Sequence, residues 1–168
     1  MASTEITITY LEHLTGPPAP LADVPGARLR YHPQPDPAWY RDRLYNGVGA
    51  DWVWYERRQL SDAAISALIL VPGIEVYTAH FNGALAGYLE LNRRDPSDVE
   101  VAYFGFFHGF TGKGLGPWMM NCALMTSYGR GAKRVWVHTC TLDHPKAVDF
   151  YRGQGFSIYR REEQTVEV

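Results

Sequence analysis

A cluster of glycines lies at Gly109–Gly116, directly before an apolar run that begins at Pro117. A glycine-rich turn between a strand and a helix can direct several backbone N–H groups, and the positive end of the helix dipole, at one place. Lys113 adds a mobile cation to that turn. Such a loop suits a pyrophosphate group, whereas the alternative is a flexible connection without a ligand.

The spacing of these glycines excludes two common phosphate-binding loops. A mononucleotide P-loop needs a lysine followed by serine or threonine, whereas Lys113 is followed by Gly114. The dinucleotide pattern G-x-G-x-x-G also fails, because Gly112, Gly114 and Gly116 are evenly spaced. The sequence therefore predicts a phosphate cradle made of backbone groups that belongs neither to an ATP site nor to an NAD site.

The elements that must position this loop can be predicted from hydrophobic periodicity and turn residues. Strands are expected where apolar residues alternate or run together, at 5–13, 27–32, 74–81, 84–94, 99–107, 133–142 and 156–168. Helices are expected at 36–49, at 60–73, from about 115 to Tyr128, and at 145–155. The run at 133–142 is nearly continuously apolar, as in a buried central strand.

Local signals support these boundaries. Asp36 and Ser61 are candidate N-caps, and Pro37 suits the first helical position. Asn82-Gly83 predicts a tight hairpin. Most of the eleven prolines fall between Pro17 and Pro37, so this stretch is expected to cross the surface.

The order of elements predicts a mixed α/β (α+β) fold in a single domain, 1–168, with an N-terminal strand and a proline-rich segment at 1–37. The expected architecture is a central mixed β-sheet of about six to seven strands flanked by about four helices.

The composition of the chain argues against several classes of partner and location. The net charge of −2 gives no general attraction for nucleic acid or an acidic membrane. No stretch approaches the roughly 20 apolar residues of a membrane helix, and the first residues lack the pattern of a secretory signal. Two cysteines are too few for a disulfide framework, so a cytoplasmic, reduced protein is expected. The proline-rich stretch and the last strand could each support a homodimer.

The second half of the chain resembles the GNAT superfamily of acetyl-CoA-dependent N-acetyltransferases. The family motif Q/R-x-x-G-x-G/A is matched by 111–116, with Thr111 in the place of the usual Gln or Arg. A second motif, A-x-x-x-Y-x-x-x-G-F, is matched by Ala147, Tyr151, Gly155 and Phe156. The resemblance is strongest over 75–160.

The resemblance implies direct acetyl transfer from acetyl-CoA to an amine, without a metal. The implied cosubstrate contacts are Phe106, Phe107, Thr111, Gly112, Lys113, Gly114, Leu115, Gly116, Pro117, His144, Ala147 and Phe150. Among them, His144 occupies the place of an asparagine that often bonds the pantetheine arm.

Tyr151 matches the general acid of the family and would protonate the departing thiolate. The alternative is a tyrosine that only packs the last helix. Glu100 matches a general base found in some members, and strand alternation would place Glu100, Ala102, Phe104 and Phe106 on one face. The alternative is a solvated carboxylate at the start of a strand.

Aromatic residues between the early helices are candidates for contact with the acceptor substrate. Trp52, Trp54 and Tyr55 lie in the region that usually walls the acceptor site in this family, and Tyr103 is a similar case. Packing in the core is the alternative for all four.

Two other chemistries have their residue types in this sequence. His138, Cys140 and His144 are close enough in the chain to be considered as metal ligands, and Cys140 as a nucleophile. No Cys-x-x-Cys accompanies them and the flanking residues are apolar, so neither a metal site nor a reactive thiol is expected.

The leading functional expectation is an N-acetyltransferase that transfers an acetyl group from acetyl-CoA to a primary amine of a small molecule. One alternative is a non-catalytic acyl-CoA-binding sensor or partner module. The other is an acetyltransferase that acts on a protein N-terminus or on lysine.

Overall fold

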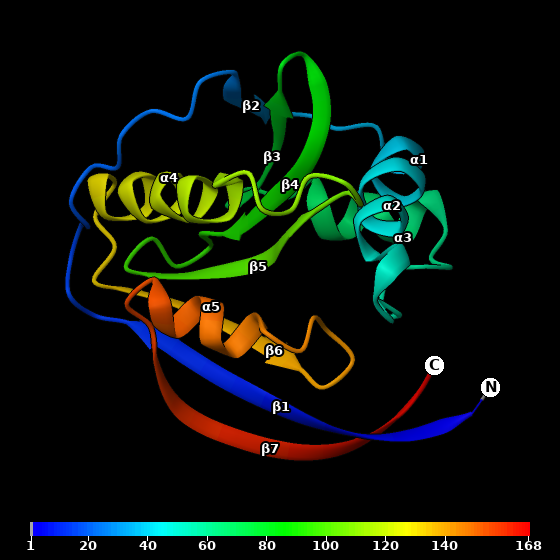
Figure 1. The fold of residues 1–168 in the computed structure, drawn as a ribbon. Coiled ribbons are helices and arrows are strands. Elements are labelled where there is room, and N and C mark those ends of the chain that lie inside the picture. Colours follow the sequence, from blue (N-terminus) through cyan, green and yellow to red (C-terminus); the bar gives the residue numbers. More distant parts are fainter. Residues whose placement is uncertain (1) are drawn as a thin grey trace.

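A computed structural model describes residues 2–168 and shows one mixed seven-stranded sheet with helices on both faces (Figure 1). The strands are β1 (Ser3–His13), β2 (Ala27–His32), β3 (Ile74–Phe81), β4 (Ala84–Asn92), β5 (Asp98–Phe106), β6 (Arg134–Cys140) and β7 (Ser157–Glu167). The helical segments are α1 (Pro37–Trp39), η1 (Tyr40–Tyr45), α2 (Asn46–Val48), η2 (Gly49–Asp51), α3 (Asp62–Ile69), α4 (Leu115–Gly129) and α5 (Ala147–Gly153). The predicted fold class is therefore confirmed.

The predicted helix starts and the predicted hairpin are present. The Asp36 side chain accepts a hydrogen bond from the Trp39 N–H, and the Ser61 side chain accepts one from the Ala64 N–H. Asn82 and Gly83 both have positive φ, at 51° and 83°, as a tight hairpin turn between twisted strands requires. Short-range turn and capping chemistry thus sets these boundaries.

The N-terminal strand lies far from its sequence neighbours in the sheet. The strand order is β2-β3-β4-β5-β6-β1-β7, so β1 is inserted between β6 and β7 and is antiparallel to both. The proline-rich segment then returns across α4, where Asn121 Nδ2 donates to the Ala19 carbonyl at 3.1 Å, and reaches β2 at the opposite edge (Figure 1). The prediction that this segment crosses the surface is confirmed.

Two hydrophobic clusters pack the two faces of the sheet. On one face, α4 and α5 cover β4, β5 and β6, with Met119, Met120 and Leu124 completely or almost completely buried. On the other face, the segment from α1 to α3 covers β3 and β4 through Tyr40, Leu44 and other residues. The segment from α1 to α3 does not extend over β6, and this leaves room for a cavity beside that strand.

Strand β6 is central in the sheet but is not buried on both faces. Val135, Val137 and Thr139 are buried under α4 and α5, whereas Trp136 and His138 are partly exposed. The prediction of a fully buried strand is therefore wrong for one face. Large aromatic side chains made the run look uniformly apolar, although only alternate residues are in the core.

Candidate active site

The neighbouring strands β5 and β6 separate soon after they begin. Among the described residues 2–168, their parallel pairing covers only Asp98–Glu100 of β5 and Arg134–Trp136 of β6. Beyond this point a cavity of about 660 Å³ lies between the strands, lined by 101–109 on one side and 137–140 on the other. The gap leaves one backbone edge of β5 without a strand partner.

A β-bulge in β5 changes which side chains face which side of the sheet. Leu91 pairs with Val101 and Glu90 pairs with Tyr103, so Ala102 is an extra residue without an opposite partner. The bulge reverses the alternation of the strand. Tyr103 therefore packs with the cluster under the first helices, and the following Phe104 packs with the cluster under α4 and α5.

The predicted common face of Glu100, Ala102, Phe104 and Phe106 is consequently wrong, because strict alternation does not survive the extra residue. Because of the bulge, Tyr103 lies on the face covered by the first helices, whereas Phe104 and Phe106 lie on the face covered by α4 and α5, and all three line the cavity.

The glycine loop after β5 has unused backbone donors. Within the part of the chain that the structure describes, no protein group accepts a hydrogen bond from the N–H groups of 111–116. Gly112 and Gly114 have positive φ (74° and 76°), a conformation that only glycine adopts without strain, and α4 begins at Leu115. The loop is thus a set of free N–H groups at the positive end of a helix.

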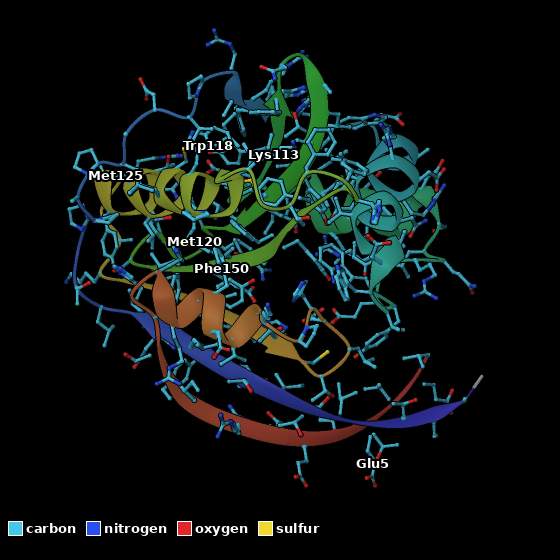
Figure 2. All side chains as sticks on the ribbon, in the orientation of Figure 1. Glu5, Lys113, Trp118, Met120, Met125 and Phe150 are labelled. Carbon is cyan, nitrogen blue, oxygen red and sulfur yellow. The ribbon has the colours of Figure 1, made fainter. Side chains whose placement is uncertain are left out.

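The loop meets the cavity at three residues, Gly109, Thr111 and Gly116. A Cβ added at Gly116 would lie 3.2 Å from Cε2 of Phe150 on α5, so the absence of a side chain allows α4 and α5 to approach closely. Lys113, labelled in Figure 2 where the loop enters α4, has its ammonium 5.8 Å from the centroid of the Phe81 ring.

The end of β5 offers one backbone edge to the cavity. The Phe107 N–H donates to the Ala86 carbonyl at 2.8 Å and is therefore occupied within the sheet. Backbone groups alternate in direction along a strand, so the N–H groups of Phe104 and Phe106 face the open side. Of the two residues that the resemblance implies as cosubstrate contacts, Phe106 therefore has its N–H on the open side, whereas the N–H of Phe107 is occupied.

Tyr151 on α5 lies at the inner wall of the cavity and is 7% exposed. Its ring packs against those of Phe104, Phe150 and Phe156. Burial, with a further contribution from the nearby negative charge of Asp143, raises the pKa of the Tyr151 phenol. The phenol is therefore protonated at neutral pH and can donate a proton.

Aromatic residues of 52–55 form a wall that is attached to the loop after β6. The Trp54 Nε1–H donates to Asp143 at 3.0 Å, and the same carboxylate accepts hydrogen bonds from the Thr139 hydroxyl and the Cys140 N–H. Trp52 packs on His144, with the ring centroids 4.7 Å apart. Two segments that are distant in sequence thus close one side of the cavity together.

The cavity brings together most, but not all, of the residues that the sequence singled out. Its lining includes Trp52, Trp54, Tyr55, Tyr103, Phe106, Phe107, Thr111, Gly116, His144, Ala147, Phe150 and Tyr151. It does not include Glu100, Gly112, Lys113, Gly114, Leu115 or Pro117. Leu115 is instead buried at the start of α4.

The lining also contains charged residues that sequence reasoning missed. Asp51, Glu56 and Asp143 supply carboxylates, and Lys146 is the single lysine or arginine among the described lining residues. The Tyr103 hydroxyl donates to Glu56 at 3.3 Å. No local pattern marks these acidic residues, because they come from two loops that meet only in the folded chain.

His138 is a further cavity residue whose surroundings the sequence does not reveal. Its Nδ1 is buried and lies 3.5 Å from Oε2 of Glu100. The nearby Glu100 carboxylate is the main cause that raises the pKa of His138, and desolvation opposes it. The sequence drew attention to His138 only as a possible metal ligand.

The other chemistries considered from the sequence find little support in the geometry. Across residues 2–168, the structure contains no group of three or more His, Cys, Asp or Glu side chains placed to hold a metal ion. Burial raises the pKa of the Cys140 thiol, and the negative charge of Asp143 raises it further, so the reactive thiolate is disfavoured. No helix in this range is long and apolar enough to cross a membrane.

Comparison with known proteins agrees with this geometry. An uncharacterized N-acetyltransferase of Mycobacterium bovis is 32% identical over 99 residues, which cover 59% of this chain and 63% of that protein. The match thus spans less than two thirds of the relative's length.

Two solved structures share the fold at low sequence identity. A GCN5-related N-acetyltransferase from Sphaerobacter thermophilus has a TM-score of 0.68 at 15% identity, covering 95% of this chain and 51% of that one. A putative GNAT acetyltransferase from Novosphingobium aromaticivorans has a TM-score of 0.62 at 17% identity, covering 96% and 64% respectively. Residues 37–156 match the acetyltransferase (GNAT) family, and the chain therefore belongs to that family.

Proposed function

We propose that this protein transfers an acetyl group from acetyl-CoA to a primary amine of a small molecule. The observation that carries the proposal is the cavity between β5 and β6, which joins the glycine loop on one face of the sheet to the aromatic and acidic wall on the other. Two substrates that enter from opposite faces would meet where the strands separate.

Acetyl-CoA is a substrate of this reaction, and the loop side of the cavity suits it. The free N–H groups of 111–116 and the start of α4 would bind the pyrophosphate. The open backbone edge at Phe104 and Phe106 would pair with the amide groups of the pantetheine arm, as a missing strand would. A backbone N–H there would also face the thioester oxygen, on which negative charge develops.

The chemical step needs a proton acceptor and a proton donor. The amine nitrogen must lose a proton before it attacks, its bond to the acetyl carbon then forms, and the bond from that carbon to sulfur breaks. Tyr151 would give its phenolic proton to the thiolate, because the ring lies at the inner wall of the cavity and is protonated at neutral pH. The second proton of the attacking nitrogen would then restore the phenol through solvent.

The acceptor side favours a small cationic amine. Asp51, Glu56 and Asp143 outnumber the single Lys146 in the lining, and several aromatic rings stand beside them. Carboxylates attract an ammonium group, and aromatic faces add cation–π attraction. A volume of about 660 Å³ that must also hold the reactive end of acetyl-CoA leaves room for a small molecule.

The test is a screen of CoA thiol release from acetyl-CoA against amino acids, polyamines, aminoglycosides, arylamines and short peptides. Turnover of at least one small amine is expected, and anionic amines are expected to be the poorest. Binding of acetyl-CoA without turnover of any amine would instead indicate a non-catalytic acyl-CoA-binding module. Turnover confined to peptides would move the proposal to a protein acceptor.

A further inference from the structure

The proposed reaction needs a residue that accepts a proton from the amine, and the preceding description of the cavity does not identify it. The sequence assigned it to Glu100, but Glu100 does not line the main cavity and its side chain is 16% exposed. It lies against His138 instead, and it lines a separate hollow with Asn92 and Trp136. Any action of this carboxylate on the amine must therefore pass through another group.

His138 is placed to be that group. Its side chain is 36% exposed and lines the cavity, whereas its Nδ1 is buried against Glu100. Because Nδ1 is buried, Nε2 is the ring nitrogen left for a group in the cavity. Because the Glu100 carboxylate lies 3.5 Å from Nδ1, it favours the proton on that nitrogen, and Nε2 then carries the lone pair that a proton acceptor requires.

The residues around His138 show that it lies on the acceptor side of the cavity. Tyr103 is on the same face of β5 as Glu100, because of the bulge, and it hydrogen-bonds Glu56. The imidazole thus stands on the side of the aromatic and acidic wall, away from the glycine loop.

We propose that His138 accepts the proton from the acceptor ammonium through Nε2, and that Glu100 is a positioning residue that fixes the ring through Nδ1. This inference rests on the proposed function and adds to it. The ammonium loses one proton to Nε2 and becomes the neutral nucleophile, and the imidazolium later releases that proton to solvent. No group other than the amine, acetyl-CoA and water is needed.

The charges around the ring are consistent with this role. Glu100 on β5, Glu56 between η2 and α3, and Asp143 after β6 all raise the pKa of His138, whereas desolvation lowers it. Tyr10 on β1 packs beside the ring, with the centroids 5.7 Å apart. The pKa of His138 therefore lies above its usual 6.5, which makes the imidazole a better base near neutral pH.

The first experiment needs no substrate. The histidine ring signals are titrated by NMR, and the signal lost in His138→Asn is assigned to His138. A midpoint above 6.5 is expected in the wild type, and Glu100→Gln should lower it because the leading cause of the shift is removed. Asp98→Asn is the matched control, since it removes a carboxylate from the same strand and should lower the midpoint less. A midpoint that Glu100→Gln leaves unchanged would overturn the pairing.

The second experiment measures kcat/KM against pH with the amine that the screen identifies. His138→Asn and His138→Gln are each expected to lower kcat/KM at neutral pH by about 100-fold, with little change in the Kd of acetyl-CoA. Glu100→Gln should give a smaller loss and move the acidic limb to lower pH, because the less basic imidazole is neutral over a wider range.

Three results would separate the possible failures. If both His138 variants keep full activity and an unchanged acidic limb while the wild type turns over an amine, this inference is wrong and the proposed function stands. If Glu100→Gln abolishes the limb and the His138 variants retain it, the carboxylate acts directly. If the wild type binds acetyl-CoA but acetylates no amine, the proposed function itself has failed, and with it the role of His138.

Discussion

Gly114 provides a direct test of the backbone cradle because its conformation and its surroundings can be separated. It lies at φ +76°, where an L-residue is strained, and no atom lies within 4 Å of a Cβ built there. Gly114→Ala therefore adds a methyl group in open space, so backbone strain of about 1–2 kcal/mol is the expected cost. We expect the loop of the free variant to relax away from this conformation and so avoid the strain.

Binding of acetyl-CoA must restore the strained conformation, because only then do the N–H groups converge on the pyrophosphate. The Kd of acetyl-CoA is consequently expected to rise by about 5–30-fold in Gly114→Ala, the factor that corresponds to 1–2 kcal/mol. Gly116→Val should also weaken binding, since its Cβ would lie 3.2 Å from Phe150. Thr111→Ala removes a hydroxyl but keeps the backbone N–H, so a change of no more than about twofold is expected.

The assay is isothermal titration calorimetry with acetyl-CoA, together with thermal unfolding of each variant. Gly131→Ala is the matched control, because Gly131 also has positive φ (101°) with no atom within 4 Å of an added Cβ, and it follows the other end of α4. Its substitution should affect stability and leave the Kd unchanged. A larger loss of affinity in Thr111→Ala than in Gly114→Ala would refute the backbone cradle.

Three further outcomes are expected. Tyr151→Phe should lower kcat by about 100-fold or more while the Kd of acetyl-CoA stays near the wild-type value, and undiminished turnover would exclude the phenol as the proton donor. The Glu90 side chain is 1% exposed and lies 2.9 Å from the Arg57 guanidinium. Glu90→Gln and Arg57→Met should each reduce the free energy of unfolding in urea by about 3 kcal/mol, because each leaves a buried partner unpaired. Glu162→Gln is the control, because the side chains of its pair with Arg160 are 31% and 58% exposed, and it should have a much smaller effect. A similar loss there would contradict the argument from burial. The pKa of His138 is raised in the folded state, so its stabilisation is complete below about pH 6.5 and is lost as pH rises through the folded value. The free energy of unfolding of the wild type should therefore exceed that of His138→Gln by less at pH 8 than at pH 5. A difference that grows with pH would contradict the direction of the pKa shift.

The sequence predicted the parts of the fold that depend on neighbouring residues. Capping by Asp36 and Ser61, the hairpin at Asn82-Gly83 and the start of α4 at Leu115 all involve groups a few positions apart. Such contacts are repeated in many proteins and can be recognised without tertiary information. The motif around Tyr151 likewise led to a residue that lies at the cavity.

The candidate site was predicted less completely on its acceptor side. The aromatic residues around Trp54 were singled out, but the carboxylates of Glu56 and Asp143 were not. Glu100 was expected as the general base, and the sequence did not show that its carboxylate lies against His138. These relations depend on the β-bulge at Ala102 and on how far β5 and β6 separate, and neither leaves a periodic signal in the sequence.

By itself, the sequence determined the types and order of the elements and the glycine loop before α4, since local periodicity and turn chemistry specify them. The tertiary structure alone decided that β1 lies between β6 and β7, where Tyr10 pairs with His138. It also decided, through an extra residue in β5, which side chains of that strand face each side of the cavity. The physical reason is that strand pairing is settled by burial and hydrogen bonds between segments distant in the chain, which no short window of sequence contains.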